Sequence, residues 1–306
     1  MEAAWLEDFL ALADCMNFSR AAERRNITQP AFSRRIRALE AWVGAPLIDR
    51  DTHRLALTPA GHAFLPAAEQ ALAVLRRGRS AASAAAEEGA GELTFLSTHA
   101  LSLTFFPQWL RAYEDAVGER PVRLMADNMV ACERQMLDGR AHFLLCHHHP
   151  AAELRVGSTA FRTLRLGADM LVAVCGRADD GSALFPLPGS QDAPLPFLAY
   201  SEESGMGRIV AAVRARHAPH AFLRPVFTSH LSTALVAQAR VGRGIAFAPL
   251  SLVESDLAPD GRLARAGDPG TDIPMDILLV RPRARMTPAA ERFWDAALAR
   301  SGGASA

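Results

Sequence analysis

The fold of the N-terminal part of the chain is decided by residues 28–40, which read Thr-Gln-Pro-Ala-Phe-Ser-Arg-Arg-Ile-Arg-Ala-Leu-Glu. Thr28 is a suitable N-cap, and the next proline falls in the first helical turn, where its missing N–H costs little. Apolar side chains recur at helical spacing and predict a buried stripe of Phe32, Ile36 and Leu39. The remaining face is formed mainly by Gln29, Pro30, Ser33, Arg34 and Arg37.

Further patterns flank this helix. Upstream, a helical pattern covers residues 5–13, and Ser19 is a natural N-cap for a short helix that ends near Asn26. Downstream, residues 46–57 predict a hairpin, because two apolar segments flank a polar one. Thr58 then begins a long helical pattern that ends in an Ala-rich tract before Gly89-Ala90-Gly91, which we interpret as a hinge. The two short helices and their tight turn predict a helix-turn-helix.

The charge of the chain is unevenly distributed. The whole sequence has 33 basic residues, all of them arginine, and 33 acidic residues, so its formal net charge is zero. Residues 20–37 nevertheless hold six arginines against Glu23 alone, whereas residues 1–17 hold four acids and no arginine. Phosphate contacts supply most non-specific affinity for DNA, so this basic segment is where DNA would bind. The alternative is a solvated amphipathic helix whose arginines pair with nearby acids.

The expected DNA contacts divide into two groups. Gln29, Ser33 and Arg34 lie near the start of the second helix, which is the part of a recognition helix that enters the major groove. Gln can pair with adenine and Arg with guanine, so we expect these side chains to reach base edges. Phosphate contacts are expected from Arg35, Arg37, Arg50 and Arg54.

From Glu92 onward, strand and helix patterns alternate, which predicts a parallel α/β domain, either as one unit or as two lobes joined by crossing strands. The predicted strands are 93–97, 122–125, 143–146, 170–175, 197–200, 226–229, 245–248 and 275–280. The predicted helices are 103–117, 129–138, 206–217, 231–241 and 288–299.

Polar side chains follow the carboxyl ends of several of these strands, where open α/β sheets bind their ligands. A helix that begins at such a point also offers free N–H groups to an anion. Each residue alone is also compatible with a cap or a turn. The candidates for an effector site are Ser97, Thr98, His99, Asp127, Asn128, His147, Tyr200, Ser201, Ser229 and His230.

Several function classes are disfavoured. The absence of lysine excludes Schiff-base chemistry and a phosphate-loop lysine. The segment Cys146-His147-His148-His149 suggests a metal, but strand alternation separates its histidines and no second cluster has zinc-like spacing, so we expect no metal and no cofactor. No nucleophile motif is present, so we expect no enzyme. The acidic N-terminus, the four cysteines without a CxxC pair and the lack of a long apolar run predict a cytoplasmic protein without membrane association.

One nearly continuous pattern extends over about 60 residues of the N-terminal region, with Ala21-Ala22, residues 28–40, Gly44, Pro46-Leu47, Arg50 and Leu57-Thr58-Pro59-Ala60-Gly61. This pattern resembles the DNA-binding domain of LysR-type transcriptional regulators. The resemblance implies an all-α winged helix-turn-helix (1–60), a linker and dimerisation helix (61–89) and an α/β effector domain (92–306) like a two-lobed periplasmic binding protein. Lobe I would cover about 92–162 and 268–306, and lobe II about 163–267. The resemblance also implies a homodimer or homotetramer that binds a pseudo-palindromic, double-stranded DNA operator.

Short motifs are scattered over both ends of the chain: Trp5-Leu6, Asp8-Phe9-Leu10, Asn17-Phe18-Ser19, His99, Leu101-Ser102-Leu103, Tyr200-Ser201, Met206-Gly207-Arg208, Met286, Pro288 and residues 290–294. They are similar to the hypochlorite-responsive branch of this family. The resemblance implies oxidant sensing at Met206, because oxidation turns an apolar thioether into a polar sulfoxide. The chain departs from that branch at Leu231, where the branch carries another methionine.

Three alternatives remain open at this point. The regulator could instead respond to a small anionic metabolite that binds between the two lobes. The chain could be a small-molecule binding protein whose first segment only forms oligomers. An enzyme on the α/β fold is the third alternative, although no motif supports it.

Overall fold

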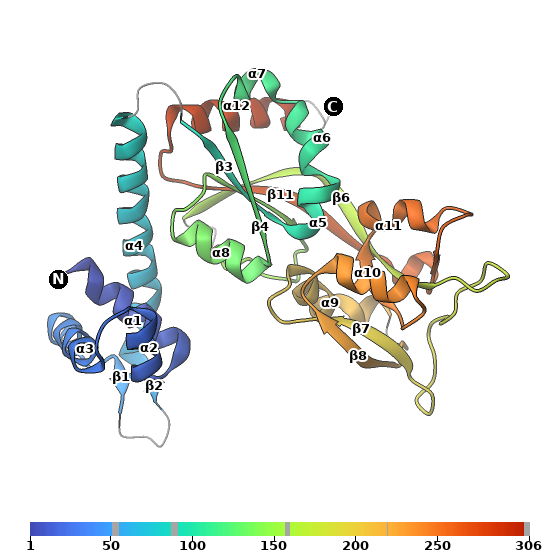
Figure 1. The fold of residues 1–306 in the computed structure, drawn as a ribbon, viewed down its shortest axis with the longest axis horizontal. Coiled ribbons are helices and arrows are strands. Elements are labelled where there is room, and N and C mark those ends of the chain that lie inside the picture. The colour runs from blue at the N-terminus through green and yellow to red at the C-terminus, as the bar shows by residue number, and fades with distance from the viewer. Residues whose placement is uncertain (51–54, 87–90, 157–159, 219, 303–306) are drawn as a thin grey trace. The chain divides into compact units, whose positions relative to one another are not determined.

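The computed structural model describes residues 1–50, 55–86, 91–156, 160–218 and 220–302 (Figure 1). The chain divides into two compact units, Met1–Ser83 with Leu137–Arg140 and Ala84–Met136 with Ala141–Ala306, and each is considered by itself. The first unit contains α1 (Ala3–Cys15), α2 (Phe18–Arg24), α3 (Gln29–Val43), β1 (Ile48–Asp49), β2 (Ala56–Leu57) and most of α4 (Pro59–Ala86).

The turns between the first three helices follow from single residues. α1 ends where Met16 adopts a left-handed conformation, with φ of 43°. The prediction that Ser19 caps the next helix is wrong, because Asn17 is the N-cap and its side chain accepts from the N–H of Arg20 at 3.0 Å. Asn26 lies in the left-handed region with φ of 53°, which asparagine tolerates better than most residues. Thr28 is the N-cap of α3, as predicted.

The core of the first unit forms where α1, α2 and α3 meet. The predicted stripe of Phe32, Ile36 and Leu39 is fully buried against apolar side chains of α1 such as Phe9 and Leu12. β1 and β2 pair antiparallel with Ile48 opposite Leu57, so the predicted hairpin is present. Its tip, with Arg54, lies outside the described residues, as do Gly89 and Ala90 of the predicted hinge.

The second unit is built on a seven-stranded sheet of order β10-β6-β11-β5-β3-β4, with β9 also paired to β6, and on a two-stranded sheet of β7 and β8 (Figure 1). Each of the eight predicted strands overlaps an observed strand, and the short β10 was missed. The strands are β3 (Leu93–Thr98), β4 (Val122–Asp127), β5 (Phe143–His148), β6 (Phe161–Gly176), β7 (Leu195–Tyr200), β8 (Leu223–Ser229), β9 (Ala246–Pro249), β10 (Leu263–Arg265) and β11 (Ile273–Pro282).

The prediction of a parallel sheet is only partly correct. β3 pairs parallel with β4 and β5, and β7 pairs parallel with β8. β6 and β11, in contrast, are long strands that pair antiparallel with each other. β11 also pairs with β5, whereas β6 pairs with β9 and β10, so these two strands cross between two lobes. The two-lobed α/β architecture is therefore confirmed.

The helices of the second unit cover the two lobes. The predicted helix 103–117 is in fact three short helices, because the chain turns at Phe105 and again near Tyr113. The helices are α5 (His99–Thr104), α6 (Phe106–Arg111), α7 (Glu114–Val117), α8 (Met129–Leu137), α9 (Gly205–His217), α10 (Ser232–Arg240), α11 (Leu250–Leu257) and α12 (Pro288–Gly302), with a 3₁₀ turn at Pro269–Thr271.

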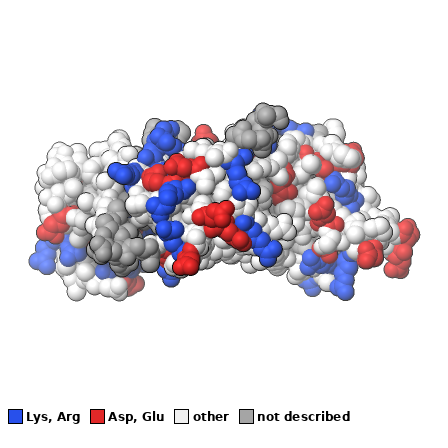
Figure 2. Space-filling view, turned by 90° about the horizontal axis from the view of Figure 1, so that it is seen from above, with Lys and Arg blue, Asp and Glu red and all other residues white. Residues whose placement is uncertain are grey.

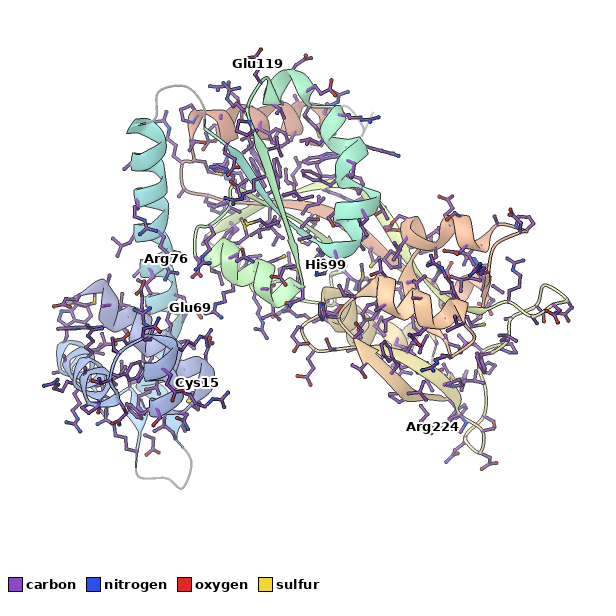
Figure 3. The ribbon with its side chains drawn as sticks, in the orientation of Figure 1. Cys15, Glu69, Arg76, His99, Glu119 and Arg224 are labelled. Atoms are coloured by element: carbon purple, nitrogen blue, oxygen red, sulfur yellow. The ribbon has the colours of Figure 1, made fainter. Side chains whose placement is uncertain are left out.

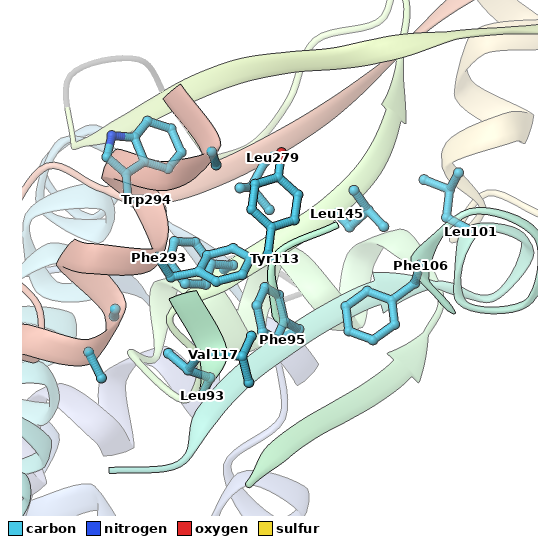
Figure 4. Close-up of a cluster of buried hydrophobic side chains, with 14 of the residues drawn as sticks. Leu93, Phe95, Leu101, Phe106, Tyr113, Val117, Leu145, Leu279, Phe293 and Trp294 are labelled. Carbon is cyan, nitrogen blue, oxygen red and sulfur yellow. The ribbon is translucent and has the colours of Figure 1, made fainter. Parts of the chain in front are cut away.

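An aromatic cluster fills the core of the first lobe (Figure 4). Phe95 of β3 stacks on Phe143 of β5 with ring centroids 5.1 Å apart, and Phe293 of α12 meets Phe95 edge-on at 5.2 Å. Such contacts add about 0.5–1.5 kcal/mol per pair beyond simple burial. The cluster fixes the strands whose carboxyl ends carry the candidate site.

The surface is mixed in charge. Figure 2 shows acidic and basic side chains interspersed on the face that it presents, in keeping with the zero net charge. No helix of the described residues is both long enough and apolar enough to cross a lipid bilayer.

Candidate functional site

α3 presents one polar face that the core does not use. Because the stripe of Phe32, Ile36 and Leu39 is buried, the opposite side of the helix faces solvent. Of the predicted DNA contacts on this helix, Gln29, Pro30, Arg34 and Arg37 are exposed, and Ser33 and Arg35 are half-buried. The structure therefore places the predicted base contacts Gln29 and Arg34 on an accessible surface near the start of the helix.

Arg35 takes part in an internal ion-pair network. The fully buried carboxylate of Asp8 accepts from Arg25 Nε at 2.8 Å and from Arg35 Nη1 at 3.3 Å. Arg25 also donates to Glu7 at 2.5 Å. Partial burial opposes ionisation of Glu7, but hydrogen bonds from Arg76 and Arg25 lower its pKa. The network links α1 to α2 and α3. Arg35, which was predicted to contact phosphate, therefore also helps to orient α3.

Arg50 is likewise held within the unit. Its guanidinium donates to Glu40 Oε2 at 2.6 Å. Oε1 of the same carboxylate accepts from the N–H groups of Leu47 and Ile48 at 3.0 and 3.1 Å. Glu40 thus ties the end of α3 to the first strand of the hairpin. Arg54, the last predicted phosphate contact, lies outside the described residues.

A recess opens where the two lobes of the second unit meet, and it encloses about 380 Å³, part of it open to solvent. It brings together Thr98, His99, Asp127, Asn128, His147 and His230 from the predicted effector residues, with Met206. The sequence analysis missed its other lining residues, Ala100, Met129, Ser204 and Gly205. Figure 3 labels His99 at the start of α5.

Four predicted effector residues do not line this recess. Ser97 is fully buried, and Tyr200 donates its hydroxyl hydrogen to Ser232 Oγ at 2.9 Å. Ser229 Oγ accepts from the N–H of Leu231 at 3.1 Å, which is a turn-stabilising bond. The hydroxyl of Ser201 is buried. Strand-end position alone does not distinguish these residues from those that face the recess.

His147 is the most deeply buried of the recess histidines, with a side chain 2% exposed. Its Nε2 lies 3.0 Å from Asp169 Oδ2, and the same oxygen accepts from Ser251 Oγ at 2.6 Å. Burial opposes ionisation of Asp169, but these hydrogen bonds lower its pKa. Because this carboxylate accepts, Nε2 carries a hydrogen. Nδ1 is buried and has no hydrogen-bond partner within the described part of the chain.

The other two histidines face each other across the recess. The rings of His99, at the start of α5, and His230, after β8, have centroids 5.8 Å apart and an interplanar angle of 41°. Burial and the proximity of His230 lower the pKa of His99, and the carboxylate of Asp127 acts in the opposite direction. His99 is therefore harder to protonate than a free imidazole.

Met206 lies in the first turn of α9 and is 7% exposed. Glycines on either side allow this turn to approach its surroundings closely. A Cβ at residue 205 would lie 3.2 Å from carbons of Met129, and a Cβ at residue 207 would lie 2.7 Å from the carbonyl oxygen of Ser201. Met129 and Met206 both line the recess, and Met206 also belongs to the buried apolar cluster of the second lobe.

A buried ion pair joins the two lobes beside the recess. Glu133 of α8 is 1% exposed, and its Oε2 lies 2.9 Å from Arg208 Nη2 of α9. Oε1 of Glu133 accepts from the N–H of Arg155 at 2.6 Å. Met129 and Met206 precede Glu133 and Arg208 on α8 and α9, so the recess wall and the inter-lobe ion pair share these two helices.

Two other histidines, His142 and His149, have structural roles outside the recess. His142 Nδ1 accepts from the N–H of Thr94 at 3.1 Å, and His149 Nδ1 accepts from the N–H of Ala151 at 3.1 Å. Burial raises the pKa of the Cys146 thiol, which keeps it protonated. Across the described ranges, no three His, Cys, Asp or Glu side chains are grouped so that they could hold a metal ion.

Two family models match the chain. Residues 3–62 match the bacterial regulatory helix-turn-helix protein, lysR family, and residues 86–302 match the LysR substrate binding domain. Among curated proteins, the chain is 31% identical to the HTH-type transcriptional regulator YjiE of Escherichia coli (strain K12), over 96% of this chain and 93% of that protein.

Solved structures are similar over nearly the full length. One is Vibrio fischeri DarR in complex with DNA, at 30% identity and a TM-score of 0.55, covering 97% of this chain and 98% of that one. Another is full-length HypT of Salmonella typhimurium, described as a hypochlorite-specific LysR-type transcriptional regulator. It shares 29% identity and a TM-score of 0.59, with 99% of each chain covered.

Proposed function

The chain belongs to the LysR family of bacterial transcriptional regulators, and from that premise we propose that α3 reads a DNA operator in the major groove. The observation that carries the proposal is the exposed face of α3 opposite its buried stripe. Gln29, Ser33 and Arg34 would contact base edges near the helix start, and Arg37 would contact phosphate. Arg35 and Arg50 would hold the helix and hairpin in position and contact phosphate with the rest of their donors.

Footprinting on the operator tests this proposal. Arg34→Ala should weaken protection of the operator, since a bidentate contact to guanine contributes about 1–3 kcal/mol of discrimination. Arg224→Ala is the matched control, because Arg224 is an exposed arginine on β8 of the other unit. If Arg34→Ala protects the same bases with wild-type affinity, α3 is not the reading helix.

We propose further that the protein acts in the cytoplasm as a homodimer or homotetramer on a pseudo-palindromic operator. Residues 61–89 would form the dimerisation helix between the DNA-binding domain and the effector domain, whose lobes have the boundaries predicted above. The described part of α4 supports this, because Val74 and Leu75 are 55% and 56% exposed. A second copy of α4 would cover this apolar pair. Sedimentation with Leu75→Arg, against the exposed-position control Gly78→Ala, distinguishes an interface from a solvated helix.

The signal, in our proposal, acts at the recess between the two lobes. A ligand there controls DNA binding only if it favours one arrangement of the lobes over another. The polar residues Thr98, Asn128 and the three histidines support a small anionic metabolite as ligand. Binding by residues 92–306 with no operator binding by the full chain would instead favour a small-molecule binding protein without a DNA function.

Oxidation of Met206 is the second candidate signal. It is favoured by the similarity to HypT, itself described as hypochlorite-specific, and by the position of Met206 in the recess wall. Met206→Leu keeps an apolar side chain of similar volume and removes the oxidisable sulfur. If operator-dependent transcription responds to hypochlorite through this residue, Met206→Leu abolishes the response and the control Met170→Leu does not. An unchanged response in Met206→Leu removes Met206 from the mechanism.

A further inference from the structure

Arg76 joins α4 to the first helices of the same unit by a directional contact, and Figure 3 labels it. It follows Ala68 and Leu72 at four-residue steps, so the three side chains share one face of α4. Ala68 and Leu72 are buried in the apolar cluster of the unit, and hydrophobic contacts have no preferred direction. The Arg76 guanidinium, in contrast, donates from Nη2 to Glu7 Oε1 of α1 at 3.1 Å. This charged contact therefore restricts the angle at which α4 packs.

From Glu7, alternating charges lead to α3. Arg25 donates to Glu7 Oε2 at 2.5 Å and, through Nε, to Asp8 Oδ1 at 2.8 Å. Asp8 Oδ2 in turn accepts from Arg35 Nη1 of α3 at 3.3 Å. Adjacent residues of a helix point about 100° apart, so Glu7 and Asp8 contact different neighbours of α1. Arg25 is the C-cap of α2, in the turn that precedes α3. The network thus connects α4, through α1 and this turn, with the recognition helix.

Opposite charges stabilise the ionised members of the network. Partial burial opposes the charge of Arg25, but hydrogen bonds to Asp8 and the charge of Glu7 raise its pKa. Arg76 also donates from Nη1 to Asp138, which belongs to the same unit. The side chain of Arg76 is 27% exposed, and it lies between two carboxylates that are themselves partly buried. A planar guanidinium held by two carboxylates is more restricted in direction than a single ammonium group.

We propose that Arg76 is a positioning residue that fixes the angle between α4 and α3, and thereby the spacing of half-sites that the protein accepts in its operator. This inference rests on the proposed function, in which α4 forms the dimer and each copy of α3 reads one half-site. The distance and rotation between two recognition helices must match those of their half-sites on the duplex. With α4 paired to a second α4, the angle from α4 to α3 in each chain sets both quantities. Arg76 acts through Glu7 and Asp8 and makes no DNA contact of its own.

The affinity for operators with altered spacers reports this angle. One added base pair rotates a half-site by about 35° and moves it by about 3.4 Å, so a dimer with fixed recognition helices loses affinity for the longer operator. A dimer whose recognition helices pivot more freely loses less. A partly exposed ion pair contributes up to about fivefold to an equilibrium constant. We therefore expect loss of the Arg76 contacts to reduce the preference for the native spacer by about fivefold.

Fluorescence anisotropy with the full-length protein tests the inference. The duplexes carry the footprinted operator with its native spacer, or with one base pair inserted or deleted. Arg76→Gln should bind the three duplexes with more similar affinities than the wild type, and Glu7→Gln should have the same effect, because both variants interrupt the network. Arg76→Lys, which keeps the charge, should lie between these variants and the wild type. The control Arg79→Gln, at an exposed position of α4, should keep the wild-type preference.

The salt dependence of binding separates a positioning role from a DNA contact. Arg76→Gln should keep the wild-type salt slope, whereas loss of a phosphate contact reduces the slope by about one. Circular dichroism and sedimentation establish that each variant is folded and has the oligomeric state of the wild type.

Three results would overturn the inference. They are wild-type spacer preferences in Arg76→Gln and Glu7→Gln, an equal loss of affinity for all three duplexes, and a reduced salt slope in Arg76→Gln. If the wild-type protein shows no preferred spacer, the proposed dimer on a pseudo-palindromic operator fails, and this inference fails with it. A clear wild-type preference that both variants retain refutes this inference alone.

Discussion

Asp8→Asn isolates the buried network that holds the recognition helix. The change keeps the shape of the side chain and removes its charge, which is fully buried between Arg25 and Arg35. A hydrogen bond to a charged group contributes about 1.5–3 kcal/mol and a neutral one about 0.5–1.5, so two weakened bonds cost about 2 kcal/mol. The side chains of Arg25 and Arg35 are 28% and 38% exposed, so water replaces part of the hydrogen bonding that the two guanidinium groups lose. We therefore do not expect the destabilisation to exceed this value.

Hydrogen–deuterium exchange of the full chain measures this effect locally. A loss of about 2 kcal/mol corresponds to about 30-fold faster exchange of protected amides in α1 and α3. Asp14→Asn is the control, because Asp14 forms an exposed ion pair with Arg24 and should change exchange by less than about threefold. If Asp8→Asn exchanges no faster than Asp14→Asn, the buried carboxylate does not hold these helices together.

Two further predictions concern stability. In Gly61→Ala the new Cβ would overlap the carbonyl oxygen of Leu47 and force the hairpin away from α4. We therefore expect the free energy of unfolding, measured in urea, to fall by about 1–3 kcal/mol. In the control Gly78→Ala, on the same helix, the new Cβ meets nothing within 4 Å, so this variant should be neutral or stabilised by up to about 1 kcal/mol. Asp169 has a lowered pKa in the folded state, so its contribution to stability is present above its ordinary pKa of 3.8 and is lost as the pH falls below it. Acid unfolding followed by near-ultraviolet circular dichroism should therefore show a shallower pH dependence in Asp169→Asn, and an unchanged profile would contradict the assignment.

The sequence predicted the elements whose signals are local. The stripe of Phe32, Ile36 and Leu39 follows from helical periodicity, and every predicted strand lies within or overlaps an observed one because short apolar runs are bounded by polar turns. The antiparallel pairing of β6 with β11 was missed, since these strands are about a hundred residues apart in the chain and no local pattern encodes their direction. Asn17 was missed as the cap and Ser19 named instead, because serine and asparagine are both good caps and only the backbone conformation decides between them.

The candidate recess was predictable only in part. Thr98, His99, Asn128, His147 and His230 lie at or next to the carboxyl ends of strands, and the structure brings them together. Tyr200 and Ser229 also lie at strand ends, but their side chains are engaged in local hydrogen bonds. Met129 and Ser204 were missed because an apolar residue or an N-cap has no sequence signal for ligand binding. Ser204 is the N-cap of α9, and this role could have been predicted from the sequence. Its position at the recess could not.

The central claim, that α3 reads DNA through its exposed face, is tested most directly by fluorescence anisotropy. Operator and scrambled duplexes are titrated with the wild-type protein, Arg34→Ala and Arg37→Ala over a series of salt concentrations. Arg34→Ala should lower the ratio of operator to scrambled affinity by about 5–150-fold, and Arg37→Ala should weaken both duplexes and reduce the salt slope by about one. Wild-type ratios and slopes in both variants would contradict the claim.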